Sequence, residues 1–395
     1  MSGDRLASRL SEIGQDAGLD AWGFCSARPF KQARAALEEG QRAGRAAGMQ
    51  FTYRNPARSC DPQRSLDGAR ALFVGAKAYA RQSPPERRGG DRRLTGSVAM
   101  YSWTDHYRVL RDALGRVAAH LEAEGWRAKV LVDDNALVDR AAAVRAGLGW
   151  YGKNTNVLLP GKGSLFVLGS VVTDAPLETA EPDAGAAREP ATMTPGAVGD
   201  GCGTCRRCVE ACPTGALDGE GHLDARLCLA WLLQAPGIFP RELRVAAGTR
   251  IYGCDDCQDA CPVNRTALRR DAPPPAEETS VDEVDLLAIL TAGDTELMER
   301  FGRWYIPKRD PDHLRRNALI ALGNSAEPGA PEVERALSDA LRHPAAMVRA
   351  HAAWAASRLG RYDLLELVAG DADPDVRDEL SAAGSVPVRA SAVKP

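Results

Sequence analysis

The chain has 395 residues, of which 44% are hydrophobic and 26% charged, and its formal net charge is −3. This composition is typical of a globular protein with two or three domains, and it excludes a globally basic nucleic-acid binder, so any RNA contact requires a local basic patch. No run of about twenty apolar residues occurs and the N-terminal segment lacks the apolar core of a signal peptide, so we expect a cytoplasmic protein that does not enter the membrane.

Residues 1–175 alternate between helix and strand patterns. Leu6, Leu10 and Ile13 recur on one face of a predicted helix near the start, and a second helix pattern covers residues 106–125. Four apolar segments bounded by turn residues predict strands, namely AWGFCSA, ALFVGAKAY, AKVLV and SLFVLGSVVT. We therefore expect an α/β domain with its own core over residues 1–175.

The rest of the chain divides into four segments. Residues 176–200 are rich in Ala, Pro, Asp and Glu without periodicity, which predicts a linker or surface loop before a cysteine-rich domain at 201–268. Over residues 280–382 the pattern is helical, and LRRNALIALG resembles VRAHAAWAAS further along, with a weaker echo from Asp373. These features predict an all-α region of short HEAT-like repeats, with an unrelated helical bundle as the alternative. Residues 383–395 are expected to form a disordered tail.

Eight of the ten cysteines have the spacing of an iron–sulfur domain. The run CGTCRRCVEACP contains C-x2-C-x2-C-x3-C-P, which in two-cluster ferredoxins gives three thiolates to one cluster and the fourth to the other. The second run, CDDCQDACP, lacks its first cysteine, and the lone Cys228 between the runs can replace it. One [4Fe–4S] cluster is therefore assigned to Cys202, Cys205, Cys208 and Cys261, and the other to Cys212, Cys228, Cys254 and Cys257.

A pair of zinc knuckles is the alternative for these cysteines. C-x2-C repeats also suit zinc, although C-x3-C-P spacing adds nothing to a tetrahedral zinc site. Cys25 and Cys60 remain outside both sets and are expected to be ordinary apolar or surface residues. Thiols used as ligands rather than in disulfides indicate a reducing, cytosolic compartment.

The densest cluster of glycine and charge in the first domain lies at residues 131–155. Asp133, Asp134 and Asn135 follow a predicted strand and precede a helix that ends at Gly147. One interpretation is that they cap this helix, whose N-terminus would lower a carboxyl pKa. The other is that one carboxylate is a general acid, which requires apolar burial to raise its pKa.

Two further segments could bind a ligand. GLGWYGKN contains Lys153 and backbone N–H groups that suit phosphate or amide oxygens, but it matches no nucleotide-binding motif. The C-terminal region carries the basic, aromatic segment ERFGRWYIPKRDPDHLRR, which could track a phosphate backbone and stack on bases or be a solvated face with buried aromatics. Its basic and aromatic members are Arg300, Phe301, Arg303, Trp304, Tyr305, Lys308, Arg309, Arg315 and Arg316.

The chain resembles the epoxyqueuosine reductases, a cobalamin-dependent family that acts on tRNA. In family order, the matching motifs are GAKAY, RAGLGWYGKNT, GSLFVLGSVVTD, CGTCRRCVEACPTGAL, LDARLC, RIYGCDDCQDACPVN and LRRNALIALGN. The resemblance implies a cobalamin-binding α/β domain joined to a two-cluster ferredoxin-like module and HEAT-like helices. It also implies reduction of epoxyqueuosine to queuosine at the wobble position, the last step of queuosine biosynthesis, by cob(I)alamin fed by two [4Fe–4S] clusters.

The resemblance also implies roles for individual residues. Counting back from GLGW places the family's general acid at Asp133, with Asp134 as a second candidate because VDDNA stands where the family has VDSAP. Cobalamin contacts are expected at Asp133, Lys153 and Ser164. The repeats would hold the anticodon arm of tRNA, an external low-potential donor would supply electrons, and a monomer is expected.

Two other functions are compatible with the motifs. A corrinoid iron–sulfur reductase of a small molecule, similar to a reductive dehalogenase, would not need the basic helical C-terminus. A ferredoxin-type electron carrier would need neither cobalamin nor Asp133.

The family's D-Y-H segment also appears here in changed order, as Asp105, His106 and Tyr107.

Overall fold

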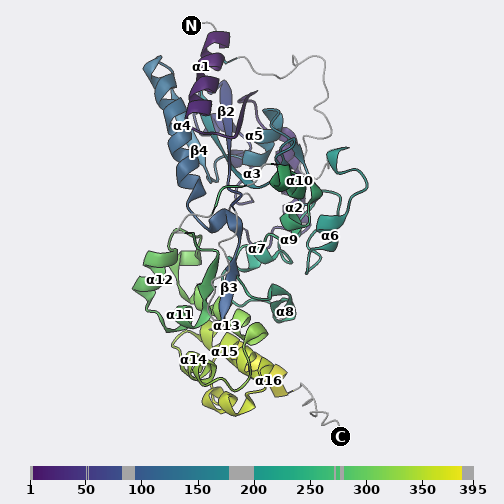
Figure 1. The fold of residues 1–395 in the computed structure, drawn as a ribbon, viewed down its shortest axis with the longest axis vertical. Helices are drawn as coiled ribbons and strands as arrows, with labels where there is room; N and C mark the ends of the chain where they lie inside the picture. The colour runs from purple at the N-terminus through teal and green to yellow at the C-terminus, as the bar shows by residue number, and fades with distance from the viewer. Residues whose placement is uncertain are drawn as a thin grey trace. The chain divides into compact units, whose positions relative to one another are not determined.

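The computed structural model describes residues 3–49, 51, 53–81, 94–177, 200–270, 273–275 and 280–384, so most of the expected linker at 176–200 and of the tail at 383–395 lies outside the described residues. The chain forms two compact units, coloured in chain order in Figure 1. None of the described helices is long and apolar enough to cross a membrane. The first unit comprises Met1–Pro85, Met100–Cys228 and Asp255–Ser280, and the second comprises Glu86–Ala99, Leu229–Cys254 and Val281–Pro395.

A four-stranded antiparallel sheet forms the centre of the first unit. Its strand order is β1-β2-β7-β4, so the two longest strands are central. Each strand lies within a segment that the sequence predicts to be a strand, and those four predictions are confirmed. The strands are β1 (Ala21–Ser26), β2 (Ala71–Ala78), β4 (Ala128–Val132) and β7 (Phe166–Thr173).

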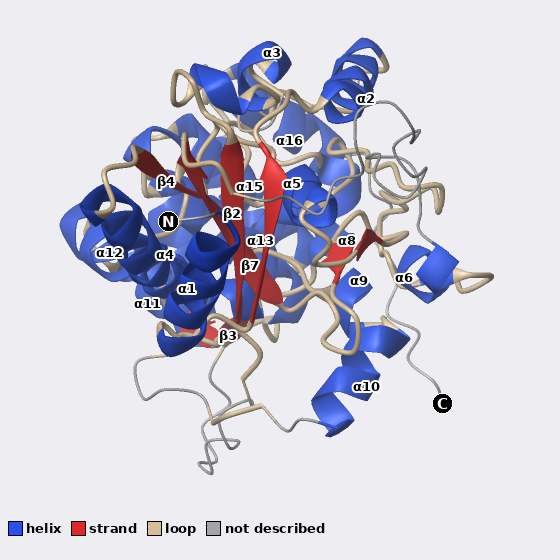
Figure 2. Cartoon of the chain, turned by 90° about the horizontal axis from the view of Figure 1, so that it is seen from above, coloured by secondary structure: helices blue, strands red, loops and turns tan. Residues whose placement is uncertain are grey.

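Helices cover both faces of this sheet, and Figure 2 shows α1 and α4 on one side of the strands and α5 on the other. Alternate residues of β2 point to opposite faces, as the strand period of two requires. Phe73 packs with Leu10 and Leu114, whereas Leu72 packs with Ala142. The expected α/β architecture of this part is therefore confirmed. The covering helices are α1 (Gly3–Asp16), α2 (Lys31–Arg42), α4 (His106–Ala123) and α5 (Asp139–Arg145).

Shorter elements complete the first unit. Cys25 and Cys60 are buried in its core, where burial raises the pKa of Cys60 to about 11, so both behave as small apolar residues as expected. The cysteine runs lie among short helices separated by turns. These elements are α3 (Pro56–Ser59), β5 (Trp150–Tyr151), β6 (Val157–Leu158), α6 (Arg207–Glu210), α9 (Asp256–Asp259) and α10 (Pro262–Arg270).

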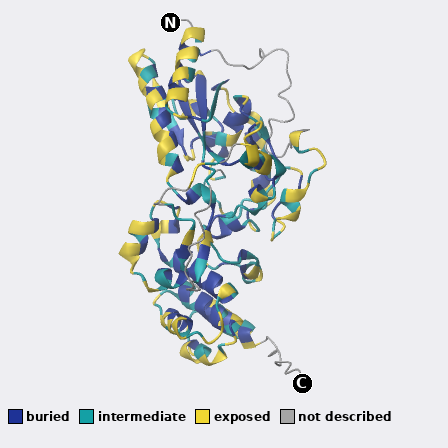
Figure 3. Ribbon diagram, viewed as in Figure 1, coloured by how far each residue is buried: buried dark blue, intermediate teal, exposed yellow. Residues whose placement is uncertain are grey.

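The second unit is mainly helical. The two segments that resemble each other lie in α13 and α15, which pack together, and the weaker echo lies in α16. Buried residues occur all around α13, which makes it a central helix (Figure 3). A small sheet of order β8-β3-β9, which the sequence does not predict, completes the unit.

The strands and helices of the second unit have the following bounds. The strands are β3 (Thr95–Val98), β8 (Arg250–Tyr252) and β9 (Glu283–Asp285). The helices are α7 (Leu229–Leu232), α8 (Arg244–Ala247), α11 (Leu286–Thr291), α12 (Asp294–Phe301), α13 (Asp312–Ser325), α14 (Pro331–Leu341), α15 (Ala346–Arg358) and α16 (Pro374–Gly384).

Candidate active site and cluster-binding cysteines

Four of the eight cysteines interact within the first unit. Burial, together with the charges of Cys202, Cys261 and Cys205, raises the pKa of the Cys208 thiol. Neighbouring thiolates repel one another, so each thiol makes deprotonation of the others less favourable. A cation bound among them offsets this repulsion and allows them to be thiolates. The donor set therefore fits an iron–sulfur cluster, for which Cys thiolates are the usual ligands.

Hydrogen bonds between loops bring part of the second cysteine set together. The Thr214 hydroxyl donates to the Leu227 carbonyl at 2.6 Å, so the loop after Cys212 lies beside the residue preceding Cys228. The backbone N–H of Ala216 donates to the Cys212 sulfur at 3.3 Å, a contact of the kind that tunes cluster potentials. The second cysteine set also includes Cys257 and Cys254. Cys257 belongs to the first unit, and Cys254 is the last residue of the segment Leu229–Cys254 of the second unit.

A buried polar network ties the second cysteine run to the sheet domain. Gln258, in α9, accepts hydrogen bonds at Oε1 from the Ser164 hydroxyl at 2.9 Å and from the Tyr79 hydroxyl at 3.2 Å. Asn264 accepts at Oδ1 from the Ser164 backbone N–H at 2.7 Å and donates from Nδ2 to the Gln258 carbonyl at 2.9 Å. The Ser164 hydroxyl, an expected cobalamin contact, is thus buried and engaged within the protein.

The glycine-rich segment at 147–154 lies against the first cysteine run. Lys153 donates from Nζ to the Gly203 carbonyl at 2.7 Å, immediately after Cys202. A side chain at Gly201 would overlap the Trp150 ring, so this close approach requires glycine. The expected cofactor residue Lys153 and the first cluster loop are therefore neighbours.

Two buried hydrogen-bond donors in this segment have no partner among the described residues. They are the ring N–H of Trp150 and the amide nitrogen of Asn154. Because a buried donor without an acceptor costs about 1–3 kcal/mol, the arrangement favours a bound group with acceptor oxygens. Cobalamin carries amide carbonyls around its ring and fits these donors. The sequence motif indicates Lys153 as a ligand-binding residue, but it does not indicate Trp150 or Asn154. Residue spacing does not tell which buried hydrogen-bond donors have no acceptor in the folded protein.

Asp133 lies directly after β4, where the chain leaves the sheet. Its φ is +52°, in the left-handed region that non-glycine residues rarely occupy and that occurs often at functional sites. Asp134 instead accepts at Oδ1 from the Ala136 backbone N–H at 2.8 Å, and Val138 occupies the N-cap of α5 without a side-chain bond. The interpretation of this segment as a helix cap is therefore wrong.

The surroundings of Asp133 favour its protonated form. The residue reaches solvent, but neighbouring protein removes part of the hydration of its carboxyl and so raises its pKa. Arg111 of α4 opposes this increase, and Asp134 adds to it. A raised pKa is what a general acid at neutral pH requires, and it is the opposite of the effect expected at a helix N-terminus.

A second carboxyl, which the sequence does not single out, interacts with Asp133. Asp139 is the first residue of α5, and its Oδ1 is buried without a hydrogen-bond partner among the described residues. Burial raises the pKa of this carboxyl well above its usual value, the charges of Asp133 and Asp134 add to the increase, and Arg140 opposes it. An acid in the first turn of a helix is so common that the pattern gives no warning of its burial.

The reordered D-H-Y segment begins α4. Asp105 is the N-cap of this helix and accepts at Oδ1 from the Arg108 backbone N–H at 2.9 Å. His106 is buried, its Nε2 lies 3.1 Å from the Thr104 hydroxyl, and its ring centroid lies 5.7 Å from that of Tyr79. These contacts account for the segment as a helix start that packs a histidine into the core.

The basic and aromatic segment at 299–316 separates into a buried and an exposed part. Phe301 and Trp304 are buried and stacked with a centroid distance of 4.8 Å, and Arg315 and Arg316 are buried as well. Counting these two arginines in a surface patch is therefore wrong, because no phosphate can reach them. The exposed members are Arg300, Arg303, Tyr305, Lys308 and Arg309.

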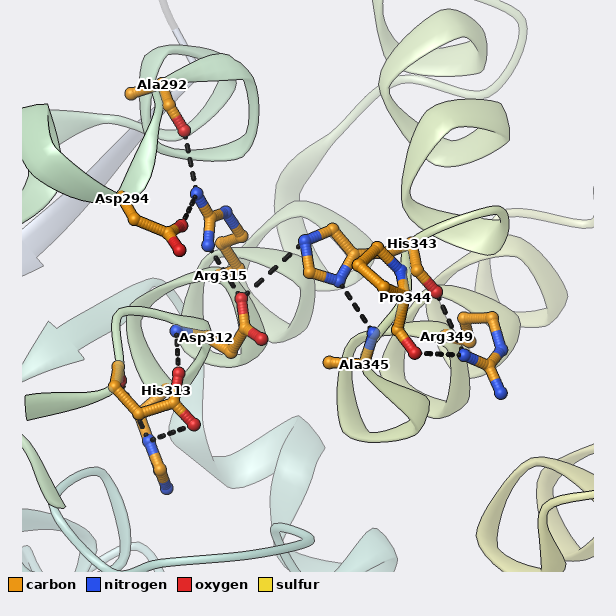
Figure 4. A network of polar contacts seen from close by, with 10 residues as sticks. Ala292, Asp294, Asp312, His313, Arg315, His343, Pro344, Ala345 and Arg349 are labelled. Carbon is orange, nitrogen blue, oxygen red and sulfur yellow. Dashed lines mark hydrogen bonds and ion pairs between the residues drawn. The ribbon is translucent and has the colours of Figure 1, made fainter. Parts of the chain in front are cut away.

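Arg315 has a structural role that Figure 4 shows. Its guanidinium bonds Asp312 at 2.6 Å, Asp294 at 2.8 Å and the Ala292 carbonyl at 2.8 Å. His343 extends the network, since its Nε2 lies 3.6 Å from Asp312 Oδ1. The arginine thus joins the start of α13 to the turn before α12.

Two family models match the chain. Residues 201–264 match the 4Fe-4S double cluster binding domain, and residues 305–384 match HEAT repeats. The first match lies within the predicted cysteine-rich domain at 201–268, and the second overlaps the predicted repeats at 280–382. An iron–sulfur cluster domain and HEAT-like repeats are therefore confirmed, against the zinc-knuckle and helical-bundle alternatives.

Relatives similar along nearly the whole chain are named epoxyqueuosine reductase. One from Bacillus anthracis is 32% identical over 366 residues, which cover 91% of this chain and 90% of the relative. A crystal structure of an epoxyqueuosine reductase with an epoxyqueuosine-modified tRNA-Tyr stem loop is 27% identical, with a TM-score of 0.83 and coverage of 97% and 98%. The Bacillus subtilis enzyme, solved with its aspartate catalytic loop swung out of the active site, is 28% identical, with a TM-score of 0.83 and coverage of 97% and 99%.

Proposed function

The chain belongs to the epoxyqueuosine reductase family, and we propose that it reduces epoxyqueuosine to queuosine at the wobble position of tRNA. The observation that carries the proposal is Asp133, an aspartate in a left-handed loop with a raised pKa, in a chain similar over 91% of its length to a named reductase. A tRNA substrate implies the cytoplasm, and we propose a monomer there.

We propose that two [4Fe–4S] clusters carry electrons within the protein. Two clusters in series would accept single electrons from an external low-potential donor. The network around Gln258 supports this role, since it anchors the second cysteine run to the sheet domain. The proposed ligands are Cys202, Cys205, Cys208 and Cys261 for one cluster, and Cys212, Cys228, Cys254 and Cys257 for the other.

Cobalamin is the proposed cofactor of the α/β domain over residues 1–175. When bound, it supplies the reducing nucleophile that the side chains of the protein lack. Lys153, Asn154 and Trp150 would hold it, because one is a cation beside the first cluster loop and the others offer unpartnered buried donors. Ser164 would support this site through Gln258 and Asn264 rather than through a direct contact of its hydroxyl.

The chain's own chemical contribution would be proton donation and exclusion of water. Asp133 would protonate the epoxide oxygen as the ring opens, and its raised pKa favours the protonated carboxyl that this step requires. Asp134 is a weaker candidate for this role, because its carboxylate already accepts the Ala136 N–H.

The tRNA would contact the helical region over residues 280–382. A cationic face that surrounds an exposed tyrosine suits an RNA backbone and a splayed base. Tyr305 is 40% exposed, and Lys308 and Arg309 follow it with φ of +53° and +55°. Consecutive left-handed residues are strained, which is typical of functional surfaces.

The test is a nucleoside analysis after anaerobic reaction. Protein reconstituted with iron, sulfide and cobalamin is incubated with a strong reductant and epoxyqueuosine-bearing tRNA, and the digested nucleosides are weighed. We expect loss of one oxygen only when cobalamin is present, with Asp133→Asn slowing the reaction by a factor of about 10² to 10⁴. Asp112→Asn, an exposed carboxyl on α4, is the matched control and should react normally.

An unchanged nucleoside would count against the proposed function if the optical spectrum shows both clusters. The same preparation would then be assayed with small halogenated substrates, since a corrinoid reductase of small molecules is the remaining interpretation of this cofactor set.

A further inference from the structure

Cys254, a proposed cluster ligand, follows a strand that is held at several points of the second unit. This strand, β8, ends at Tyr252 and pairs with β3, and the Ala99 backbone N–H donates to the Tyr252 carbonyl at 2.9 Å. The side-chain amide of Asn317, in α13, donates to the Ile251 carbonyl at 2.9 Å. Cys254 itself packs against buried apolar residues of the same unit. Contacts within the second unit therefore fix the chain up to this cysteine.

The side chain of Tyr252 extends these contacts to the basic and aromatic segment. Its ring is buried and stacks with that of Trp304, with a centroid distance of 4.7 Å and an interplanar angle of 14°. Its Oη accepts a hydrogen bond from the Tyr305 backbone N–H at 2.8 Å. Only Gly253, with a φ of +72°, separates Tyr252 from Cys254. A displacement of the Tyr305 backbone would therefore reach Cys254 through one side chain and two peptide bonds.

Tyr305 lies in a loop that Arg309 closes. The Arg309 guanidinium donates from Nη1 to the Gly302 carbonyl at 3.1 Å, and we call residues 302–309 the Tyr305 loop. Lys308 and Arg309 occupy the left-handed region, with φ of +53° and +55°. A strained backbone of this kind persists only while its contacts hold it. A ligand that takes one of these contacts would therefore change the conformation of the loop.

A bound RNA is such a ligand, because a phosphate at Arg309 would compete for the same guanidinium. Guanidinium–phosphate pairs are charge-assisted and frequently bidentate, so the phosphate would draw the guanidinium away from the Gly302 carbonyl. A base stacked on the exposed Tyr305 ring would act on the same loop. RNA would thus make different contacts with two conformations of the Tyr305 loop, and a ligand shifts an equilibrium only through such a difference.

The sulfur of Cys254 is where this change would act on electron transfer. The reduction potential of an iron–sulfur cluster depends on the hydrogen bonds to its sulfurs and on its exposure to solvent. We propose that Tyr252 is a positioning residue that couples RNA binding at the Tyr305 loop to the reduction potential of the cluster held by Cys254. In the coupled event the external donor loses one electron and the cluster iron gains it. The inference rests on the proposed function, since it requires both the RNA substrate and the cluster.

The test is a redox titration of the cluster-loaded protein, followed by electron paramagnetic resonance, with and without an unmodified RNA hairpin of an anticodon arm. Coupling between linked sites typically changes affinity by at least about fivefold. At 59 mV per tenfold for one electron, saturating hairpin should shift the potential of one of the two clusters by about 40 mV or more. Because coupling is reciprocal, the hairpin should bind the oxidised and reduced states of that cluster with affinities that differ by the same factor. An unshifted potential with the hairpin bound would overturn the inference.

Tyr252→Phe separates the proposed contact from the charge of the RNA. It keeps the ring and removes the hydroxyl that accepts the Tyr305 N–H, so the variant should load both clusters and bind the hairpin but lose most of the shift. Tyr362→Phe, at an exposed tyrosine of the same unit, is the matched control and should keep the full shift. A full shift in Tyr252→Phe would mean that the RNA charge acts on the cluster through space, and it would overturn the proposal.

Failure of the proposed function would look different in the same titration. If both cluster signals are present and the hairpin does not bind to the wild-type protein, then the proposed RNA site is wrong and the inference falls with it. If the hairpin binds and neither potential moves, the RNA site stands and only the coupling through Tyr252 is refuted. The potential itself distinguishes coupling from a purely structural role, because a tyrosine that serves only the fold would not make it depend on RNA.

Discussion

Arg316 allows a direct test of whether a particular arginine of the second unit stabilises the fold or binds RNA. It is fully buried in α13, and its guanidinium hydrogen-bonds a turn of the preceding segment. Burial lowers the pKa of this group to about 9, which leaves it charged at neutral pH. Its acceptors are the carbonyls of Leu232, Leu233, Ala235 and Gly237, at 2.7–3.1 Å, and Asn317 Oδ1 at 3.0 Å.

Arg316→Lys keeps the charge but removes donors. An ammonium group has three N–H bonds, so at least two of the five hydrogen bonds of the guanidinium are lost. A hydrogen bond to a charged group contributes about 1.5–3 kcal/mol, so the loss of two should reduce the unfolding free energy by about 3–6 kcal/mol. That is a large share of the roughly 5–15 kcal/mol that stabilises a typical domain.

The assay is denaturant unfolding of the reconstituted protein, with amide hydrogen exchange to locate the change. Exchange should accelerate in peptides from α13 and from residues 229–251, and the unfolding midpoint should fall. Arg335→Lys, at an exposed position of α14, is the matched control. Equal midpoints for the two variants would refute the reasoning, and a selective loss of tRNA affinity at an unchanged midpoint would return Arg316 to the RNA surface.

Three further outcomes follow from the same structure. Gln258→Leu removes the acceptor of the Tyr79 hydroxyl and the nearer acceptor of the Ser164 hydroxyl, so the clusters should be lost faster to an iron chelator than in wild type. Lys308→Ala and Arg309→Ala should each reduce the slope of log affinity for tRNA against log salt by about 0.7–0.9, whereas Arg335→Ala should not. Because partial loss of hydration raises the pKa of the Asp133 carboxyl, turnover should fall as pH rises through that pKa, and this dependence should be absent in Asp133→Asn.

The parts of the fold that depend on local periodicity could be predicted from the sequence. The four strands are short apolar segments bounded by turn residues, and the cysteine spacing alone indicates iron–sulfur ligands. The order β1-β2-β7-β4 could not be predicted, because it depends on pairing between segments far apart in the chain. The bonds of Ser164 with Gln258 and Asn264 span 94 and 100 residues and leave no local pattern.

The prediction was wrong for charged residues that the sequence suggests lie at the surface but that the fold buries. Arg315 and Arg316 look like surface residues in an arginine-rich stretch, yet each is buried because backbone carbonyls or carboxylates surround its guanidinium. Asp139 looks like an ordinary first-turn acid, yet its Oδ1 is buried and has no hydrogen-bond partner within the described part of the chain. No composition argument separates these cases from solvated charges, since the separation depends on which partners the tertiary fold supplies.

The recognisable motifs of this chain are therefore mainly parts of its scaffold. In LRRNALIALGN the two arginines and Asn317 hold neighbouring backbone, and in GLGWYGKN Lys153 bonds the first cluster loop. The reacting proton, by contrast, is assigned to an aspartate in VDDNA, the segment that departs from the family pattern. A chain could keep every scaffold contact and still lose the reaction through a change at this loop. For this reason Asp133, rather than the motifs that identify the family, is the position at which activity must be tested.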